Sequence, residues 1–248
     1  MPGSTVTGAS PAPPGFFGKL PGQGDFVTRR LPQEFLRVWD PWLQAALTES
    51  RASLGEDWLD AYLTSPIWRF VLTGGIAGQP PWAGLLMPSV DRIGRYFPLT
   101  VACELPPTCN PFSVMGTAAD WFSQTQSLML AALEGALDVQ EMDAQLLATC
   151  ALPPQMLYPS VVPAGTDNQG WRLSLERPAQ IGQVVPALLH HALAEVFFAY
   201  SLWWSEGSER ITPSLLLSQG LPTGDAFESL YTGDWSSGSW WDLGELAG

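Results

Sequence analysis

The residues best suited to chemistry lie in a short charged stretch between two apolar runs. Pro88 to Thr100 reads PSVDRIGRYFPLT and places Asp91, Arg92 and Arg95 close together. One carboxylate beside two guanidiniums can form a binding site, because loops held by a rigid scaffold often carry function. The same side chains can instead form a closed, bidentate Arg–Asp pair that only holds the loop. Of these two interpretations we favour the structural pair.

A second candidate lies in GKLPGQGD, near the N-terminus. This segment resembles a phosphate-binding loop only superficially, because such a loop needs Ser or Thr after its lysine and Lys19 is followed by Leu20. Asp25 and Asp91 could meet in space as an acid/base pair, which would make the protein a hydrolase with arginines clamping a phosphate. Nothing in the spacing requires that pair.

Other chemistry finds little support. His190 and His191 are the only histidines, and adjacent helical residues point about 100° apart, so one metal cannot bind both without distortion. Cys103, Cys109 and Cys150 show no pairing pattern, which is typical of reduced thiols. We therefore expect no metal and no cofactor, and the residues show no recognisable active site.

Composition narrows the class of partner. The formal net charge is −13, which argues against nucleic acid and against an anionic membrane surface. Residues 1–95 balance eight acids with eight bases, whereas residues 96–248 hold the other sixteen acids against three bases. The second half thus presents an acidic surface that could meet a basic partner or simply keep the protein soluble.

The chain has no secretory signal and no apolar run long enough to span a membrane, so we expect a cytoplasmic protein without membrane insertion. Residues 1–14 are rich in Pro, Gly, Ser and Ala and should form a disordered leader. Residues 15–235 should form a single domain. The tail, 236–248, should be mobile, or docked through Trp240 and Trp241.

The periodicity predicts elements of both kinds. A helical stripe begins at Leu31, and Pro41 should break or restart that helix with Asp40 as a cap. The helix at 186–200 is apolar on most faces and should be buried. The other expected helices lie near 58–64, 117–137, 143–149 and 225–230, and the expected strands at 16–19, 67–72, 82–87, 96–103, 171–175, 201–204 and 214–218.

These elements predict an α/β protein of the α+β type. Strands fall in two groups separated by helices, and several strands are neighbours in sequence. We expect a layered sandwich in which helices flank one mixed, mainly antiparallel sheet.

Several long motifs resemble the TagF family, also called ImpM, of accessory proteins of the bacterial type VI secretion system. The resemblance covers residues 15–105 closely and 201–235 more loosely. It is carried by GFFGKLPGQGDFVTRRLP (Gly15 to Pro32), WDPWL (Trp39 to Leu43), SPIWRFVLTGG (Ser65 to Gly75) and WAGLLMPSVDRIGRYFPLT (82–100).

The resemblance implies a cytoplasmic protein that represses type VI secretion after translation by binding the forkhead-associated scaffold protein of that system. It also implies a regulator without enzymatic activity. A structural subunit of the secretion apparatus is the alternative, and a hydrolase is a further one. The candidate partner-binding residues are Lys19, Asp25, Arg29, Arg30, Asp91, Arg92 and Arg95, of which Asp25 with Arg29, and Asp91 with Arg95, could equally be internal pairs.

Overall fold

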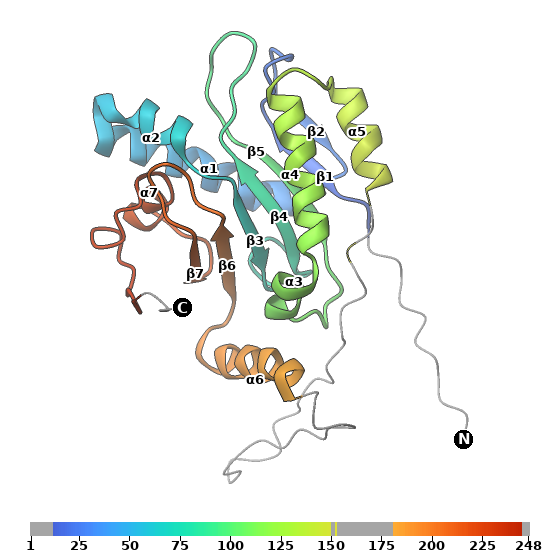
Figure 1. Ribbon diagram of the computed structural model, residues 1–248, viewed down its shortest axis with the longest axis vertical. Coiled ribbons are helices and arrows are strands. Elements are labelled where there is room, and N and C mark those ends of the chain that lie inside the picture. The colour runs from blue at the N-terminus through green and yellow to red at the C-terminus, as the bar shows by residue number, and fades with distance from the viewer. Residues whose placement is uncertain (1–11, 150–151, 153–180, 245–248) are drawn as a thin grey trace.

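The computed structural model describes residues 12–149, 152 and 181–244, and its centre is a seven-stranded sheet (Figure 1). The strand order is β2-β1-β5-β4-β3-β6-β7, and every neighbouring pair is antiparallel. The strands are β1 Gly15–Gly18, β2 Val27–Arg29, β3 Trp68–Leu72, β4 Trp82–Met87, β5 Leu99–Glu104, β6 Tyr200–Ser205 and β7 Ser214–Gln219. The predicted α+β fold with a mainly antiparallel sheet is confirmed.

Helices cover both faces of this sheet, which explains why β3 and β4 are buried along their whole length. One hydrophobic cluster joins the sheet to α1 Gln33–Leu54, α2 Trp58–Thr64 and α7 Asp225–Thr232. The other joins it to α3 Pro111–Thr117, α4 Ala119–Leu133 and α5 Val139–Ala148. The connections β1–β2 and β4–β5 leave the sheet at the same end, at the top of Figure 1.

The first long helix differs from the prediction. Pro41 lies inside α1, which runs without a break to Leu54 and has Gly55 as its C-cap. Pro41 itself is exposed, while its neighbours Trp39 and Trp42 are buried in the core beneath the helix. The burial of this stripe outweighs the hydrogen bond that proline removes, so the predicted break at Asp40 is wrong.

Three elements were missed or placed differently. The strand β2 has only three residues and no periodic signal of its own. The helix expected at 117–137 is α4, which is shorter, and a separate helix that was not predicted, α3, precedes it: the Asn110 side chain accepts from the backbone of Phe112 and Ser113, and Pro111 occupies the first turn. The helix α5 starts at a capping box formed by Asp138 and Glu141, four residues before the predicted position.

The helix α6, Ile181–Val196, is not the buried helix that its composition predicted. Val185, Leu188 and Val196 are exposed, and Phe198, just beyond the helix, is 94% exposed. The helix lies at one end of the molecule, next to α3, rather than on a sheet face (Figure 1).

The described part of the tail is attached through one of its two tryptophans. Trp240 Nε1 donates to Ala226 O at 3.2 Å, whereas Trp241 is 93% exposed. The expected leader lies outside the described residues, except for residues 12–14, and so does the strand expected at 171–175.

Candidate functional site

The charged stretch and the glycine-rich stretch form one site, which we call the paired loops: residues 19–26 between β1 and β2, and residues 88–98 between β4 and β5. They meet because β1 pairs with β5, so both connections leave the same end of the sheet. The Arg92 backbone N–H donates to Gln23 O at 3.0 Å. The Ser89 hydroxyl donates to Lys19 O at 2.7 Å.

Asp91 is the centre of the paired loops, and its carboxylate is fully buried. Lys19 Nζ lies 2.5 Å from its Oδ2, and Arg95 Nε donates to the same oxygen at 2.6 Å. The backbone N–H groups of Ile93 and Arg95 donate to Oδ1 at 3.0 and 2.9 Å. The Arg95 guanidinium continues to the backbone oxygen of Gly24 in the other loop. Asp91 therefore fixes both loops at once.

These contacts set the protonation state of Asp91. Burial alone raises the pKa of the carboxyl group, but hydrogen bonds from Lys19, from the Arg95 backbone and side chain, and from the Ile93 backbone outweigh it. The pKa of Asp91 is thus held well below its usual range. The carboxylate stays ionised at neutral pH and pairs with two cations, so the three side chains together carry one net positive charge.

The outer surface of the paired loops, which we call the tip, combines cationic and apolar side chains. Its members are Phe26, 47% exposed, Ile93, 67% exposed, Arg92, which is also exposed, and Arg95, whose side chain is 54% exposed. Gly94 allows the turn between the two arginines, with φ of 86°. Phe26 and Ile93 were not among the predicted site residues, although both stand inside the quoted motifs.

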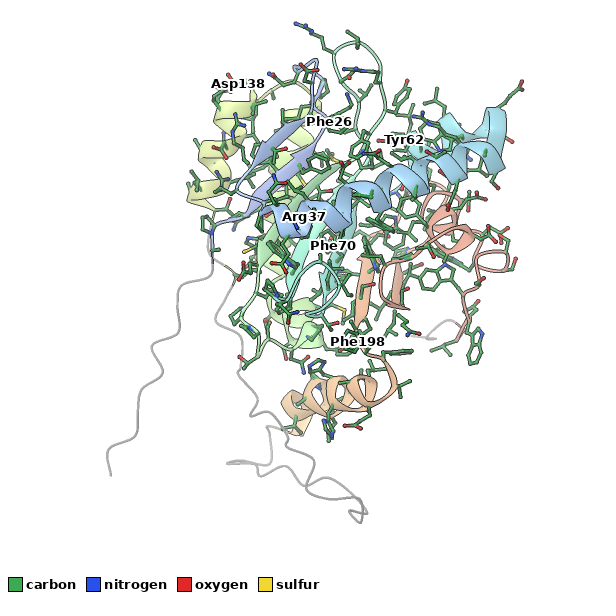
Figure 2. All side chains as sticks on the ribbon, turned by 180° about the vertical axis from the view of Figure 1, so that it is seen from behind. Phe26, Arg37, Tyr62, Phe70, Asp138 and Phe198 are labelled. Carbon is green, nitrogen blue, oxygen red and sulfur yellow. The ribbon has the colours of Figure 1, made fainter. Side chains whose placement is uncertain are left out.

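Phe26 is exposed yet firmly positioned. Its ring stacks on Phe17 at 5.5 Å between centroids and meets the edge of Phe97 at 4.8 Å. Lys19 Nζ lies 4.6 Å from the ring centroid, within the range of a cation–π contact. Figure 2 shows Phe26 at the end of the molecule opposite Phe198.

The structure separates the predicted site residues into two groups. Lys19, Asp91, Arg92 and Arg95 come together in the paired loops, and the exposed Asp25 follows Gly24 in the same place.

Arg29 and Arg30 lie instead toward the far end of the β1–β2 hairpin, where Arg29 is opposite Phe16. Within the described chain the ion pairs include none between Asp25 and Arg29, and Arg29 donates to Thr28 O. Arg30 donates to Pro14 O at 2.9 Å and forms a 2.5 Å ion pair with Asp143 of α5.

This geometry bears on the hydrolase hypothesis. Each oxygen of Asp91 accepts two hydrogen bonds, and the side chain has no exposed surface. A general base must come within hydrogen-bond reach of the substrate proton that it removes. Asp91 cannot do so without dismantling the loops, so its role here is to position the tip.

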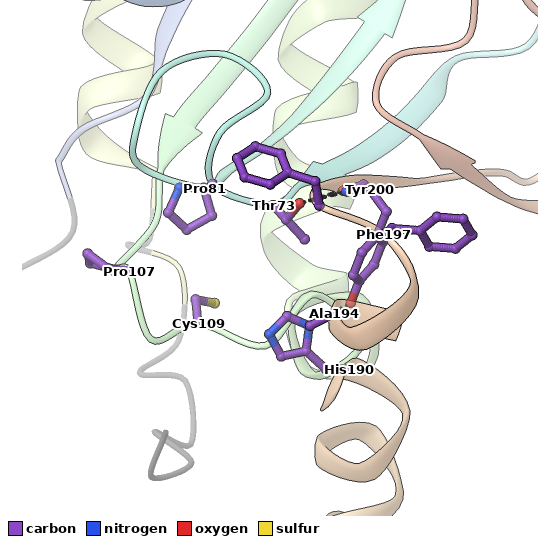
Figure 3. Close-up of a pocket in the computed structure, with 10 residues that line it drawn as sticks. Thr73, Pro81, Pro107, Cys109, His190, Ala194, Phe197 and Tyr200 are labelled. Atoms are coloured by element: carbon purple, nitrogen blue, oxygen red, sulfur yellow. Dashed lines mark hydrogen bonds between the residues drawn. The ribbon is translucent and has the colours of Figure 1, made fainter. Parts of the chain in front are cut away.

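A second feature is a cavity of about 200 Å³ between α6 and the nearby end of the sheet (Figure 3). Its lining includes Thr73, Cys109, His190, Phe198 and Tyr200. His190 Nδ1 lies 2.6 Å from the Tyr200 hydroxyl. Burial raises the pKa of the Cys109 thiol to about 12, so it remains protonated and poorly nucleophilic at neutral pH. The Cys109 thiol in this cavity is therefore not an activated nucleophile.

Within residues 12–149, 152 and 181–244, no group of three or more His, Cys, Asp or Glu side chains is arranged to hold a metal ion. None of the helices in this part of the chain combines the length and the apolar character needed to cross a membrane.

The fold and site define an α+β protein that presents a rigid, exposed loop tip. Residues 15–149 match the model of the TagF N-terminal domain, described as type VI secretion system-associated. The chain belongs to the TagF family. The crystal structure of PA0076 from Pseudomonas aeruginosa PAO1 is similar, with 40% identity, a TM-score of 0.78, and coverage of 95% of this chain and 99% of that one. No curated protein matches the chain.

Proposed function

We propose that this chain is a non-enzymatic negative regulator of type VI secretion, which acts after translation by binding the forkhead-associated scaffold protein and restraining assembly. The observation that carries the proposal is the tip itself. Two motifs typical of the family, near the N-terminus and at 82–100, fold against each other and hold exposed side chains in a fixed arrangement. The contact surface we assign to the scaffold is the tip.

The composition of the tip suits protein recognition. Aromatic residues and arginine are enriched at protein interfaces, and Phe26, Arg92 and Arg95 supply both kinds. Because the buried Lys19–Asp91 ion pair fixes the loop backbone before binding, little conformational entropy has to be lost on association. We expect an acidic patch with an apolar centre on the scaffold.

The test is a titration of the purified chain against the cognate scaffold at low and at moderate salt. We expect binding that weakens as salt increases, because exposed charges are screened over a Debye length of about 10 Å at 0.1 M. Arg92→Glu and Ile93→Asp should each raise the Kd about tenfold or more, which corresponds to a loss of about 1.4 kcal/mol.

Arg37→Glu is the matched control, because Arg37 is exposed on α1 and the charge change is identical. It should leave the Kd within about twofold, which is below 0.5 kcal/mol. If the unaltered chain fails to bind at either salt, the scaffold mechanism is wrong for this protein. If the chain binds and both tip variants bind equally well, the contact surface lies elsewhere. Stable co-purification with assembled sheath or baseplate would favour a structural subunit instead.

A further inference from the structure

The two edges of the sheet are built differently. The β2 edge is three residues long, includes Arg29 and is followed by Arg30. Short length and exposed charge are common ways of preventing a sheet edge from pairing with another chain. The β7 edge reads SLLLSQ over six residues, with no charge and no proline. Within the described residues β7 pairs only with β6, so this edge lacks both protections.

One face of β7 also leaves apolar side chains uncovered. Leu216 points into the cluster shared with α1 and α7, and is 9% exposed. Because side chains alternate along a strand, Leu215 and Leu217 point to the opposite face. Leu215 is 55% exposed, and Leu217 is partly exposed. A strand added at this edge would bury both.

The sequence of β7 is self-complementary. Ser214 to Ser218 reads SLLLS in both directions, with Leu216 at its centre. In a two-fold symmetric interface, residue i meets residue j and j meets i. Antiparallel pairing centred on Leu216 places Leu215 opposite Leu217 of a second copy and Ser214 opposite Ser218. Every pair thus joins two leucines or two serines.

Charge does not oppose this arrangement, although each chain has a net charge of −13. The charged residues nearest to β7 in sequence are Arg210 and Glu209 in the β6–β7 turn and Asp225 at the start of α7; Glu206 lies farther away. Antiparallel pairing places that turn beside the chain that follows Gln219 in the other copy. That segment, 220–224, is uncharged, so Glu209 and Arg210, which the same register would place opposite residues 223 and 222, meet no charged side chain there.

We propose that β7 pairs with β7 of a second copy, antiparallel and centred on Leu216, and joins the two sheets into one. The occupant is a second copy rather than an unrelated strand, because the palindrome places leucine opposite leucine and serine opposite serine when two copies pair. The dimer leaves the tip free, because β7 lies at the β6 edge of the sheet and the paired loops follow β1 and β4.

Sedimentation velocity over a range of concentrations tests the association. The unaltered chain should form a concentration-dependent dimer. Leu215→Lys should shift the population to monomer, because each copy then brings one lysine charge into the apolar contact between Leu215 and Leu217. Leu63→Lys, at a leucine of α2 that is 53% exposed, is the matched control and should leave the dimer intact. Circular dichroism should show that both variants remain folded.

Cross-linking tests the register. In the proposed pairing, residues 215 and 217 of different copies are directly opposite, about 4.5 to 5.5 Å apart at Cα, which suits a disulfide. Leu215→Cys mixed with Leu217→Cys should form a disulfide-linked dimer on oxidation, and neither variant alone should do so. A chain that is monomeric at every concentration overturns the proposal, as does a dimer that Leu215→Lys leaves intact. Equal cross-linking in the unmixed samples overturns the register.

Discussion

Lys19 Nζ lies 2.5 Å from Asp91 Oδ2, and this ion pair joins loops whose residues are 72 positions apart. Both side chains are almost completely buried. A buried ion pair is most costly to disturb when one partner is removed and the other remains charged. The stability of the tip is therefore concentrated in two side chains that no partner would touch.

Asp91→Asn should lower the stability at neutral pH, because Lys19 then remains buried without its counter-charge. The folded pKa of Asp91 is lowered, so its contribution is present above the unfolded pKa of about 3.9 and is lost as the pH falls through the lower, folded value. Urea midpoints should therefore differ most near pH 7 and converge under strong acid. Asp25→Asn, at an exposed carboxylate of the same loops, should show no comparable difference.

Thr100→Val should lower the free energy of unfolding by about 1 to 3 kcal/mol. Trp39 Nε1 donates to the Thr100 hydroxyl at 2.8 Å, and both residues are fully buried, so valine leaves the indole N–H without an acceptor. Chemical denaturation measures the change. Thr48→Val, at an exposed position of α1, should stay within about 0.5 kcal/mol, and an equal loss at both positions would contradict the argument.

Pro41→Ala should raise the free energy of unfolding by about 1 to 3 kcal/mol, because alanine restores a backbone donor inside α1 without disturbing the buried stripe. The reverse change nearby, Ala45→Pro, should destabilise the chain by about 3 kcal/mol or more. Both positions are exposed, so packing changes little. A loss of stability in Pro41→Ala would mean that the proline serves the fold in another way.

Acid should weaken the attachment of α6. Burial, and then the neighbouring His191, lower the pKa of His190. Burial raises the pKa of the Tyr200 hydroxyl, so this group keeps its proton and lies 2.6 Å from Nδ1 of an imidazole whose charged form burial disfavours. Because the folded pKa is the lower one, this stability is complete above the unfolded value of about 6.5 and declines as the pH falls below it.

Thermal midpoints between pH 8 and pH 5 measure that effect. His190→Gln should flatten the decline between pH 6.5 and pH 5, whereas His191→Gln should retain most of it. An identical pH dependence in the unaltered chain and in His190→Gln would show that His190 contributes nothing to it.

Contacts between residues close in sequence could be predicted at this site, whereas contacts between residues far apart in sequence could not. The pairing of Asp91 with Arg95 could be predicted, because four positions in one loop bring the side chains together. The role of Lys19 could not, because it depends on β1 lying beside β5, and no periodic pattern encodes that order. Local propensity wrongly predicted a break in the first helix at Pro41, where tertiary burial decides the outcome.

The solvent exposure of apolar side chains was the property hardest to predict from the sequence. The apolar composition of α6 predicted burial, yet Val185, Leu188 and Leu189 lie on the surface of the described molecule. The helix α3, by contrast, was missed although its signal was present: Asn110 followed by Pro111 is a common start of a helix.

The family match ends at residue 149, but the sheet does not. The strand β3 pairs with β6, and Trp203 of β6 packs against Trp39, Trp42 and Phe70 from the matched region. A gene divided between codons 149 and 181 would therefore encode two pieces, neither with a complete core. Expressed separately, the pieces should be insoluble or unfolded; expressed together, they should reassemble through β3 and β6. This strand order therefore predicts that the two fragments complement each other, and that neither can be exchanged as an independent domain.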